Sequence, residues 1–499
     1  MQVLSANAVF GIPNVFSRKA SSNLQASSHN GMHRGAKTHR SFHKARRCHV
    51  VRLGRQAICG VLNKDDHGMG VGTGLGDITG PCDGVGMMGY AMPLQTTTGI
   101  LQRLWARAFV LGDADMSEGH VAIVVADLCM IFPNVKAAVV GRLKDVLGDG
   151  HYNEENLLIC ATHTHAGPGG FSPYGLYNIT TAGFSQRNFD CIVDGIADAV
   201  LQAHRTFERT ARDDVRASLR LLRTHISAPK AAINRSPAAY ANNPQDERAK
   251  YDSDVDEELL MLHITRESAS KAQGASNERQ KGAGSEAEQL AGEQLAGLIC
   301  WFATHGTSLH NSNHLISGDN KGYASYLLEN QYSGGSSPAV SSGSAGDVPS
   351  GPFIAAFPQP ASGDVSPNVN GVNCTVTGGE CHPLHSTSWG CVTLCRGQGP
   401  GGRDDVTSAA SIGELQAAAA SRLLKSSQQH PGIPEELLAG PIRSALAWVD
   451  FGGGHHVAGG FTRDGAPART APPAKGYRSP AVVVTYSAAS VHGVKLKLS

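Results

Sequence analysis

One stretch of the chain constrains its fold more than any other. Residues 121–126 form an uninterrupted apolar run rich in β-branched side chains, typical of a strand buried on both faces. Apolar side chains then recur at helical spacing over 134–147, with Asn134 placed as a cap and Gly148 as a stop. A second apolar run at 157–161 predicts the next strand. Strand, helix and strand in this order predict a parallel crossover unit, and therefore an α/β protein.

Two later apolar runs, 259–264 and 298–302, repeat the strand signal. We therefore expect a mixed β-sheet core flanked by helices. Glycine makes up 59 of 499 residues, so many tight turns and glycine-rich loops should join these elements. The longest apolar stretch, 121–132, is too short to cross a membrane and contains Asp127.

The charge of the chain is unevenly distributed. Lys and Arg number 43 and Asp and Glu 42, yet residues 1–64 carry eleven basic side chains and no acidic one. The remaining residues have a net charge of −10. A body that is mildly acidic lacks the basic footprint of a nucleic-acid-binding protein, so we expect no nucleic acid among its partners.

Two features point to different compartments. The basic segment 1–64 is rich in Ser, Arg and His, a composition typical of a plastid or mitochondrial targeting peptide; a solvated basic tail is the alternative. Four clustered cysteines favour two local disulfides over a zinc knuckle because their spacing is too wide: Cys374, Cys381, Cys391 and Cys395. Disulfides indicate an oxidising compartment, which favours a secreted, extracellular or membrane-associated protein.

The rest of the chain divides by composition. Residues 267–297 are polar and end in a tandem EQLAG repeat, and residues 333–352 are mostly Ser, Gly and Pro. Neither segment has enough apolar side chains to offset its ordering entropy, so we expect two disordered surface inserts. The tail 451–499 is rich in Gly, Ala and Pro, and its sequence assigns it no fold.

Histidines occupy the ends of two predicted strands. His163 and His165 follow the strand ending at Ala161, and His305 follows the one ending at Phe302. Ligands collect at the carboxyl ends of strands in open α/β sheets, and residues i and i+2 of an extended segment face the same way. Neutral imidazole binds zinc, which activates water for nucleophilic attack. The alternative for each histidine is an ordinary polar residue with satisfied hydrogen bonds.

Two further segments carry polar groups suited to a site. Arg235, in Asn-Arg-Ser-Pro, offers a planar fork that suits an oxyanion. The alternative is a surface loop with a solvated arginine. Ser366 lies in Gly-Asp-Val-Ser-Pro-Asn, a sharp polar turn. The alternative there is a turn in which Asp364 and Asn368 bond their own backbone.

In this order along the chain, the motifs resemble the neutral ceramidase family. The resemblance covers about 71–450, apart from the two inserts, so we expect a ceramidase-like catalytic domain over that range. The segments that carry it are Gly76–Pro81, Met87–Ala91, Trp105–Phe109, Thr162–His165, Ile233–Pro237, Trp301–His305, Ser317–Ala324, Gly363–Asn368, the four-cysteine loop, Gly440–Ile442 and Val449–Asp450.

The resemblance implies a zinc-dependent amidohydrolase. The family cleaves the amide of ceramide (N-acylsphingosine) to sphingosine and a fatty acid, with one Zn²⁺ per catalytic domain. His163 and His305 match two of its zinc ligands, while His165 and Arg235 match groups that hold the scissile carbonyl and its oxyanion. Ser366 matches a serine sometimes regarded as the nucleophile. We favour zinc-activated water as the attacker, with Ser366 contacting substrate, because no base adjacent to the serine is identifiable. An amphiphilic substrate implies peripheral contact with membranes or lipid aggregates.

The sequence also departs from the family. The family's other two zinc ligands, a Glu and a Tyr, have no motif match; Glu435, Glu436 and Tyr477 do not qualify. The family's C-terminal immunoglobulin-like domain is absent, and Leu309-His310 replaces the usual Met-Asn. The sequence thus resembles a C-terminally truncated member. The alternatives are a catalytically inactive lipid-binding relative and a zinc amidase acting on another N-acyl lipid.

Overall fold

The computed structural model describes most of the chain from residue 69 to residue 429, and short strands beyond it. The described ranges are 69–113, 119–213, 215–268, 293–333, 351–382, 394–429, 436–438, 442–449, 456–457, 468–469 and 479–486. The basic segment 1–64, most of both predicted inserts and Cys391 lie outside these residues.

The first sheet contains the predicted crossover unit. Its strands lie in the order β1-β4-β5-β6: β1 (Met69–Asp77), β4 (Trp105–Asp113), β5 (His120–Ala126) and β6 (Leu157–Ala161). The pairs β1/β4 and β4/β5 are antiparallel, whereas β5 and β6 are parallel and joined by α1 (Pro133–Leu147). The α/β class and the strand–helix–strand unit are therefore confirmed.

The second sheet is formed by five strands in the order β13-β11-β10-β8-β17. These are β13 (Ile354–Ala356), β11 (Glu293–Trp301), β10 (Glu258–Ser268), β8 (Val215–His225) and β17 (Glu436–Leu438). All neighbours are antiparallel except β11 and β13. The predicted strand 259–264 lies in the first part of β10, and the predicted strand 298–302 covers the end of β11 and the residue after it.

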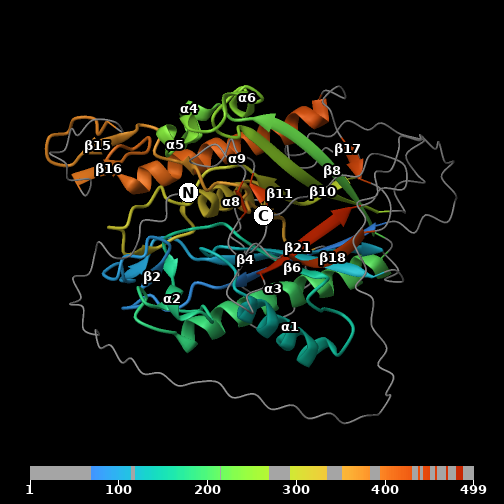
Figure 1. Ribbon diagram of the computed structural model, residues 1–499. Helices are drawn as coiled ribbons and strands as arrows, with labels where there is room; N and C mark the ends of the chain where they lie inside the picture. The colour runs from blue at the N-terminus through green and yellow to red at the C-terminus, as the bar shows by residue number, and fades with distance from the viewer. Residues whose placement is uncertain are drawn as a thin grey trace, which may run out of the picture. The chain divides into compact units, whose positions relative to one another are not determined.

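Three apolar cores show that the sheets form the two inner layers of a four-layer sandwich. The middle core joins alternate residues of both sheets, such as Phe109 and Ile123 of the first and Ile264 and Ile299 of the second. The opposite face of the first sheet packs on α1 and α3 (Gln186–Arg212). The opposite face of the second sheet packs on α8 (Asp319–Tyr332) and α9 (Asp405–Gln429) (Figure 1). Each central strand is therefore apolar on both faces.

Strand β1 is adapted to the helix above it. Its alternate residues Gly72, Gly74 and Gly76 face α3, and a Cβ added to any of them would collide with a backbone carbonyl of that helix. The intervening side chains, such as Val71 and Leu75, enter the core between the two sheets. The strand thus brings the backbone of α3 into direct contact with the sheet.

Some predicted boundaries were wrong. Asn134 does not cap α1: Phe132 holds the cap position, and the Asn134 amide donates to the carbonyl of Phe171 instead. The helix does end at Gly148, whose φ of 85° suits glycine. The predicted insert 267–297 was too wide, because β10 runs to Ser268 and β11 starts at Glu293, where strand pairing orders polar residues.

Shorter elements connect these layers. The helices are α2 (Gly175–Asn178), α4 (Ala228–Ala231), α5 (Pro237–Ala241) and α6 (Gln245–Arg248). The remaining paired strands are β2 (Met87–Met88) with β7 (Gly167–Pro168), β3 (Gly99–Ile100) with β12 (Leu315–Ile316), β9 (Ile233–Asn234) with β14 (Val365–Ser366), β15 (Val372–Cys374) with β16 (Cys395–Gly397), β18 (Ile442–Val449) with β21 (Ser479–Tyr486), and β19 (His456–Val457) with β20 (Ala468–Arg469).

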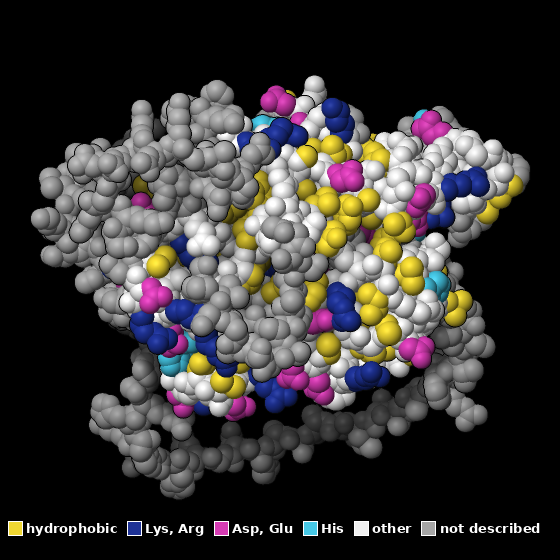
Figure 2. Space-filling view, turned by 180° about the vertical axis from the view of Figure 1, so that it is seen from behind, with side chains coloured by type: hydrophobic (Ala, Val, Ile, Leu, Met, Phe, Trp, Pro, Cys, Tyr) yellow, Lys and Arg dark blue, Asp and Glu magenta, His cyan; other side chains and the backbone are white. Residues whose placement is uncertain are grey.

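The surface of the described residues is mixed in character. Figure 2 shows basic, acidic and apolar side chains interspersed over the described part of one face. Within the described part of the chain, no helix combines the length and the apolar character needed to cross a membrane. Asp127, which interrupts the longest apolar stretch, is buried and paired with Arg107, and Arg107 also binds Glu329 of α8.

Candidate active site

Three predicted site histidines meet where β6 and β11 end. The Nε2 atoms of His163 and His305 are 3.0 Å apart, and Nε2 of His165 is 3.3 Å from that of His163. The rings of His165 and His305 have centroids 5.1 Å apart. We call these three residues the carboxyl-edge cluster. The structure thus brings together two chain segments that are 142 residues apart in sequence.

The local backbone achieves this differently from the prediction. His163 has φ of 65°, in the left-handed region that non-glycine residues rarely adopt, so the segment is not a continuous extended strand. Thr164 then forms a parallel bridge with Gly306, next to His305. A Cβ on Gly306 would collide with the carbonyl of His163, so glycine permits this close approach. The side chains of His163 and His165 lie close together as predicted, but the extended-strand reason for this was wrong.

Backbone carbonyls fix the protons of two of the imidazoles. Nδ1 of His163 lies 2.5 Å from the carbonyl oxygen of Cys129, and Nδ1 of His305 lies 2.9 Å from that of Ser362. A carbonyl oxygen only accepts hydrogen bonds, so each Nδ1 carries a proton. In the neutral ring, each Nε2 atom then carries a lone pair and is an acceptor. The two Nε2 atoms therefore face one another as acceptors, an arrangement that a cation between or beside them would stabilise.

The environment keeps these rings uncharged. Burial lowers the pKa of His165 to about 2 and that of His305 to about 4, and it also lowers the pKa of His163. The neighbouring histidines and Arg235 act in the same direction. Cys129 is the fourth group of ligand type, but burial raises the pKa of its thiol to about 12, so it stays protonated. The available donors are neutral imidazoles.

The nitrogen spacing fits a zinc ion. Tetrahedral zinc with bonds of about 2.05 Å separates its ligand nitrogens by about 3.3 Å. The Nε2 atoms of His163 and His305, the two residues that match zinc ligands, are 3.0 Å apart, which is close to that value. Carbonyl acceptors on the outer nitrogens are also the usual partners of metal-binding histidines.

Arg235 and Ser366 lie on one short ribbon beside the cluster. Strand β9 pairs with β14 so that Ser366 faces Ile233, and the Arg235 backbone N–H donates to the carbonyl of Asp364 at 2.8 Å. The Arg235 side chain is exposed, yet its charge acts on all three histidines of the cluster. The hydroxyl of Ser366, a mostly buried residue, accepts the N–H of Asn368 at 3.2 Å. Among the described residues, no titratable side chain bonds this hydroxyl.

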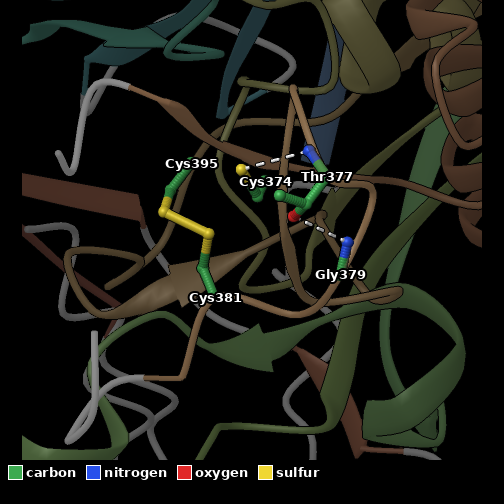
Figure 3. The surroundings of a disulfide bond; sticks show 5 residues. All are labelled: Cys374, Thr377, Gly379, Cys381 and Cys395. Atoms are coloured by element: carbon green, nitrogen blue, oxygen red, sulfur yellow. Dashed lines mark hydrogen bonds between the residues drawn. A yellow bond between two sulfur atoms is a disulfide. The ribbon is translucent and has the colours of Figure 1, made fainter. Parts of the chain in front are cut away.

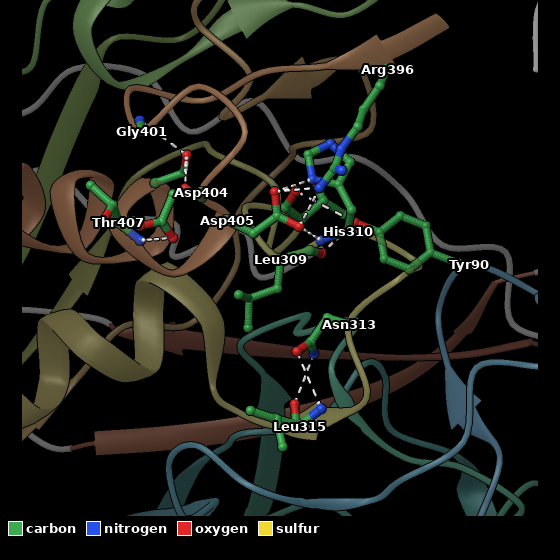
Figure 4. Close-up of polar contacts among 12 residues, drawn as sticks. Tyr90, Leu309, His310, Asn313, Leu315, Arg396, Gly401, Asp404, Asp405 and Thr407 are labelled. Carbon is green, nitrogen blue, oxygen red and sulfur yellow. Dashed lines mark hydrogen bonds and ion pairs between the residues drawn. The ribbon is translucent and has the colours of Figure 1, made fainter. Parts of the chain in front are cut away.

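A polar network supports the loop that carries His305. Tyr90 packs edge-to-face on His165, with ring centroids 4.8 Å apart, and donates its hydroxyl to the carbonyl of Leu309 at 2.7 Å. His310 and Arg396 both bind Asp405, the first residue of α9 (Figure 4). Burial alone would raise the pKa of Asp405, but its bond to His310 and the charges of His310 and Arg396 lower it. This carboxylate therefore stays ionised and anchors the loop.

Comparison with known proteins decides the family. A sequence model described as "Neutral/alkaline non-lysosomal ceramidase, N-terminal" matches residues 69–277 and 286–489. The chain belongs to this family. The resemblance deduced from the motifs is therefore confirmed, and the matched region extends beyond the predicted limit at 450 into the tail that the sequence left unassigned.

Individual ceramidases match over much of this chain but over only part of their own length. Neutral ceramidase A of Dictyostelium discoideum is 42% identical over 70% of this chain and 42% of the relative, and neutral ceramidase B is 40% identical over 78% and 47%. The solved neutral ceramidase from Pseudomonas aeruginosa is 33% identical, with a TM-score of 0.56 over 81% of this chain and 51% of that one. A "Ceramidase complexed with C2" is 32% identical with a TM-score of 0.57, covering 81% and 50%. The chain spans about half the length of these relatives.

Sequence reasoning missed the groups that hold the carboxyl-edge cluster in place. Cys129 and Ser362 act through backbone carbonyls, which any residue type supplies, so no sequence signal marks them. Tyr90 lies in a matched motif and was given no role. Of the unmatched candidates for the missing zinc ligands, Glu436 begins β17, and Glu435 and Tyr477 lie outside the described residues.

The cysteine loop contains one disulfide among the described residues. Cys381 is bonded to Cys395, and Cys374 is a free thiol that accepts the N–H of Thr377 (Figure 3). Two local disulfides were predicted, and the described residues contain one of them; Cys391 lies outside the described residues. The bond joins the end of the β15 loop to β16.

Proposed function

We propose that this chain is a zinc-dependent amidohydrolase that cleaves ceramide to sphingosine and a free fatty acid. One observation carries the proposal: the Nε2 atoms of His163 and His305 face each other at 3.0 Å while both Nδ1 atoms bond backbone carbonyls. Membership of the neutral ceramidase family supplies the substrate class. The chain spans about half of its relatives, so the reaction is a proposal for this chain.

The residues around the carboxyl-edge cluster can be assigned roles in amide hydrolysis. His163 and His305 would hold the zinc ion, which when bound supplies Lewis acidity and lowers the pKa of water. The oxygen of water forms the new bond to the acyl carbon, the C–N bond breaks, and the leaving nitrogen gains a proton. Arg235 and His165 would bond the carbonyl oxygen as it acquires negative charge. His165 is neutral, so it would act as a hydrogen-bond donor rather than as an acid.

Ser366 suits substrate contact better than nucleophilic attack. A serine nucleophile needs a neighbouring base to accept its proton. Its hydroxyl instead accepts an N–H from Asn368, which leaves its own proton free for a substrate oxygen or nitrogen. We therefore assign Ser366 to substrate binding.

We also propose that the protein contacts membranes or lipid aggregates at its periphery. Leu94, Leu176 and Ile179 are 84%, 77% and 70% exposed. Leu94 lies near the site, because Gln95 next to it donates to the carbonyl of His165, while Leu176 lies in α2 and Ile179 at its C-terminal end. Exposed apolar side chains of this size can enter a lipid surface. Replacing all three with serine should reduce sedimentation with phosphatidylcholine vesicles, and unchanged sedimentation would contradict the proposal.

For the compartment, we propose the secretory pathway or the cell exterior. The Cys381–Cys395 bond supports an oxidising environment. Fractionation of a C-terminally tagged chain tests this, since recovery in plastids or mitochondria would support the targeting-peptide alternative instead.

The direct test of the proposed function is ceramide hydrolysis by the purified full chain. Sphingosine release should require zinc, stop on chelation, return on zinc addition, and be lost in H163A and H305A. H225A, which changes an exposed histidine at the end of β8, serves as the matched control. A zinc-loaded chain that binds ceramide without turnover would support the inactive lipid-binding alternative. Hydrolysis of N-acyl amino acids but not of ceramide would assign a different substrate.

A further inference from the structure

A second group of histidines lies at the opposite end of strands β5 and β6. His120 begins β5, His151 lies just before β6, and His204 is on α3. The carboxyl-edge cluster follows the other end of β6. A seven-residue strand spans roughly 20 Å at 3.3 Å per residue, so the two groups are separate sites. We call His120, His151 and His204 the amino-edge cluster.

The amino-edge cluster has the geometry of a ligand set. One ligand nitrogen from each ring lies within 4.8 Å of the other two. The ring centroids are 5.2 Å apart for His151 and His204, 5.5 Å for His120 and His204, and 6.2 Å for His120 and His151. Ligand nitrogens on tetrahedral zinc are about 3.3 Å apart, so small side-chain rotations bring this set to metal-binding distance.

The hydrogen bonds of the cluster leave donor nitrogens available. Nε2 of His120 is buried and has no partner among the described residues, while the ring bonds the backbone of His151 through its other nitrogen. Nδ1 of His204 is paired with the hydroxyl of Tyr152 at 3.0 Å. A lone buried nitrogen costs free energy unless it finds a partner. In His120 and His204, one ring nitrogen is thus held by another group and the opposite nitrogen remains for a ligand, as in metal-binding histidines.

A carboxylate completes the surroundings. Oε1 of Glu208, one turn along α3, lies 3.6 Å from Nε2 of His204. That oxygen can serve as a fourth ligand or accept a proton from the His204 ring. Three imidazoles with one carboxylate favour first-row divalent ions such as Zn²⁺ over Ca²⁺ or Mg²⁺, which prefer oxygen ligands.

We propose that the amino-edge cluster is a second metal site, which binds Zn²⁺ or a similar first-row divalent ion through His120, His151 and His204. The site ties the start of β5, the loop before β6 and the middle of α3 to one ion. It therefore acts on the stability of the first sheet rather than on the reaction. The proposal is independent of the activity proposed above, because none of these residues belongs to the carboxyl-edge cluster.

The test measures zinc per chain and zinc-dependent melting temperature on the full chain. His151 is half-buried, so H151A removes a ligand with little effect on packing; H225A is the matched control. Relative to H225A, H151A should bind one zinc fewer per chain after gel filtration, and its melting temperature should rise less when zinc is added. Comparing the two variants cancels zinc held elsewhere, including by the five histidines of segment 1–64.

A second background separates the two sites. In H163A/H305A, the amino-edge cluster should still bind one zinc per chain, and adding H151A should abolish that binding. Circular dichroism checks that each variant is folded. If H163A/H305A is not folded, the comparison of H151A with H225A in the otherwise unchanged chain decides whether the proposal holds. Equal zinc content and equal thermal shifts in H151A and H225A would overturn the proposal and leave the cluster a set of packed polar rings.

Discussion

The two histidine clusters lie beyond opposite ends of β6, and their surroundings differ. At the carboxyl edge, loops from both sheets bring an exposed arginine and a serine beside the imidazoles. At the amino edge, the imidazoles are packed against Tyr152 and Phe207, with Glu208 near His204. The same ligand type is therefore present twice, but groups suited to a carbonyl substrate lie beside one cluster.

The difference follows from the direction of the strands. Loops that leave the carboxyl ends of β6 and β11 are long and polar, and they can approach a ligand from several sides. Elements at the amino edge are held by α3, which covers that part of the sheet. The two clusters therefore differ in the loops around them and not in their imidazoles.

The largest expected effect sets the clusters apart directly. H305A removes a proposed zinc ligand and should lower kcat/KM for ceramide by at least about 1,000-fold. H151A removes a ligand of the amino-edge cluster and should change kcat/KM for ceramide by less than about twofold. Steady-state rates of sphingosine release with saturating zinc check both values. An equal loss in the two variants would mean that the clusters are not functionally distinct.

The next effect tests the arginine beside the carboxyl-edge cluster. R235A should lower kcat by roughly 100- to 1,000-fold, the usual cost of losing one oxyanion donor. R235K keeps the charge but not the planar fork, so it should recover only part of the rate. R205A, on the exposed side of α3, is the control for loss of a surface arginine. If R235A raised KM alone, Arg235 would bind substrate without stabilising the transition state.

A buried histidine outside both clusters shows the cost of burying an imidazole without a hydrogen-bond partner. His263 on β10 is 1% exposed, and neither ring nitrogen has a partner among the described residues. Burial, with a smaller effect of Arg220, lowers its pKa to about 4, from 6.5 in the unfolded chain. The unfolded chain therefore takes up a proton first as the pH falls. Stability from this group is fully present above pH 6.5 and is lost as the pH falls from 6.5 to 4.

The loss from His263 should reach about 3 kcal/mol, since each pKa unit corresponds to about 1.4 kcal/mol. H263L should remove this part of the pH dependence, while H225A should keep it. Urea unfolding at pH 7, 5.5 and 4.5 measures the difference between the variants. A free energy of unfolding that falls equally steeply in H263L would show that other groups are responsible.

The smallest expected effect concerns two tyrosines, one beside each cluster. Y152F removes the partner of His204 Nδ1 and should cost about 1 kcal/mol of unfolding free energy. It should also weaken zinc binding at the amino-edge cluster roughly tenfold, as loss of an outer hydrogen bond to a metal-binding histidine does. Y90F removes a hydroxyl of the same type next to His165 and should leave that zinc affinity unchanged. Calorimetric zinc titration of both variants in the H163A/H305A background distinguishes them.

The local elements of the fold were predictable, but their assembly was not. The apolar run at 121–126 and the helical period after it identified β5 and α1, because both faces of that strand are buried. The division into two face-to-face sheets could not be read, since a strand buried against a helix and one buried against another sheet have the same apolar pattern. Strand β1 was missed because its alternate glycines hide the pattern.

The side chains of the candidate site could be predicted from the sequence, but the backbone groups that position them could not. His163, His165 and His305 follow strand ends, and the structure places them together. Arg235 and Ser366 come from one ribbon, although their motifs lie far apart in the sequence. The carbonyls of Cys129 and Ser362 and the left-handed φ of His163 leave no trace in residue type. The amino-edge cluster was missed because His120, His151 and His204 share no motif and are joined only by the fold.

The glycines of β1 also limit how this molecule can change. Most packed positions tolerate exchange in either direction, because a smaller or larger side chain can be matched by its neighbour. At Gly72, Gly74 and Gly76 every exchange adds atoms against the main chain of α3, which has nothing to trim in return. Variation at these three sites can therefore proceed only by separating helix and strand, and protein engineers who wish to strengthen this contact must alter residues elsewhere.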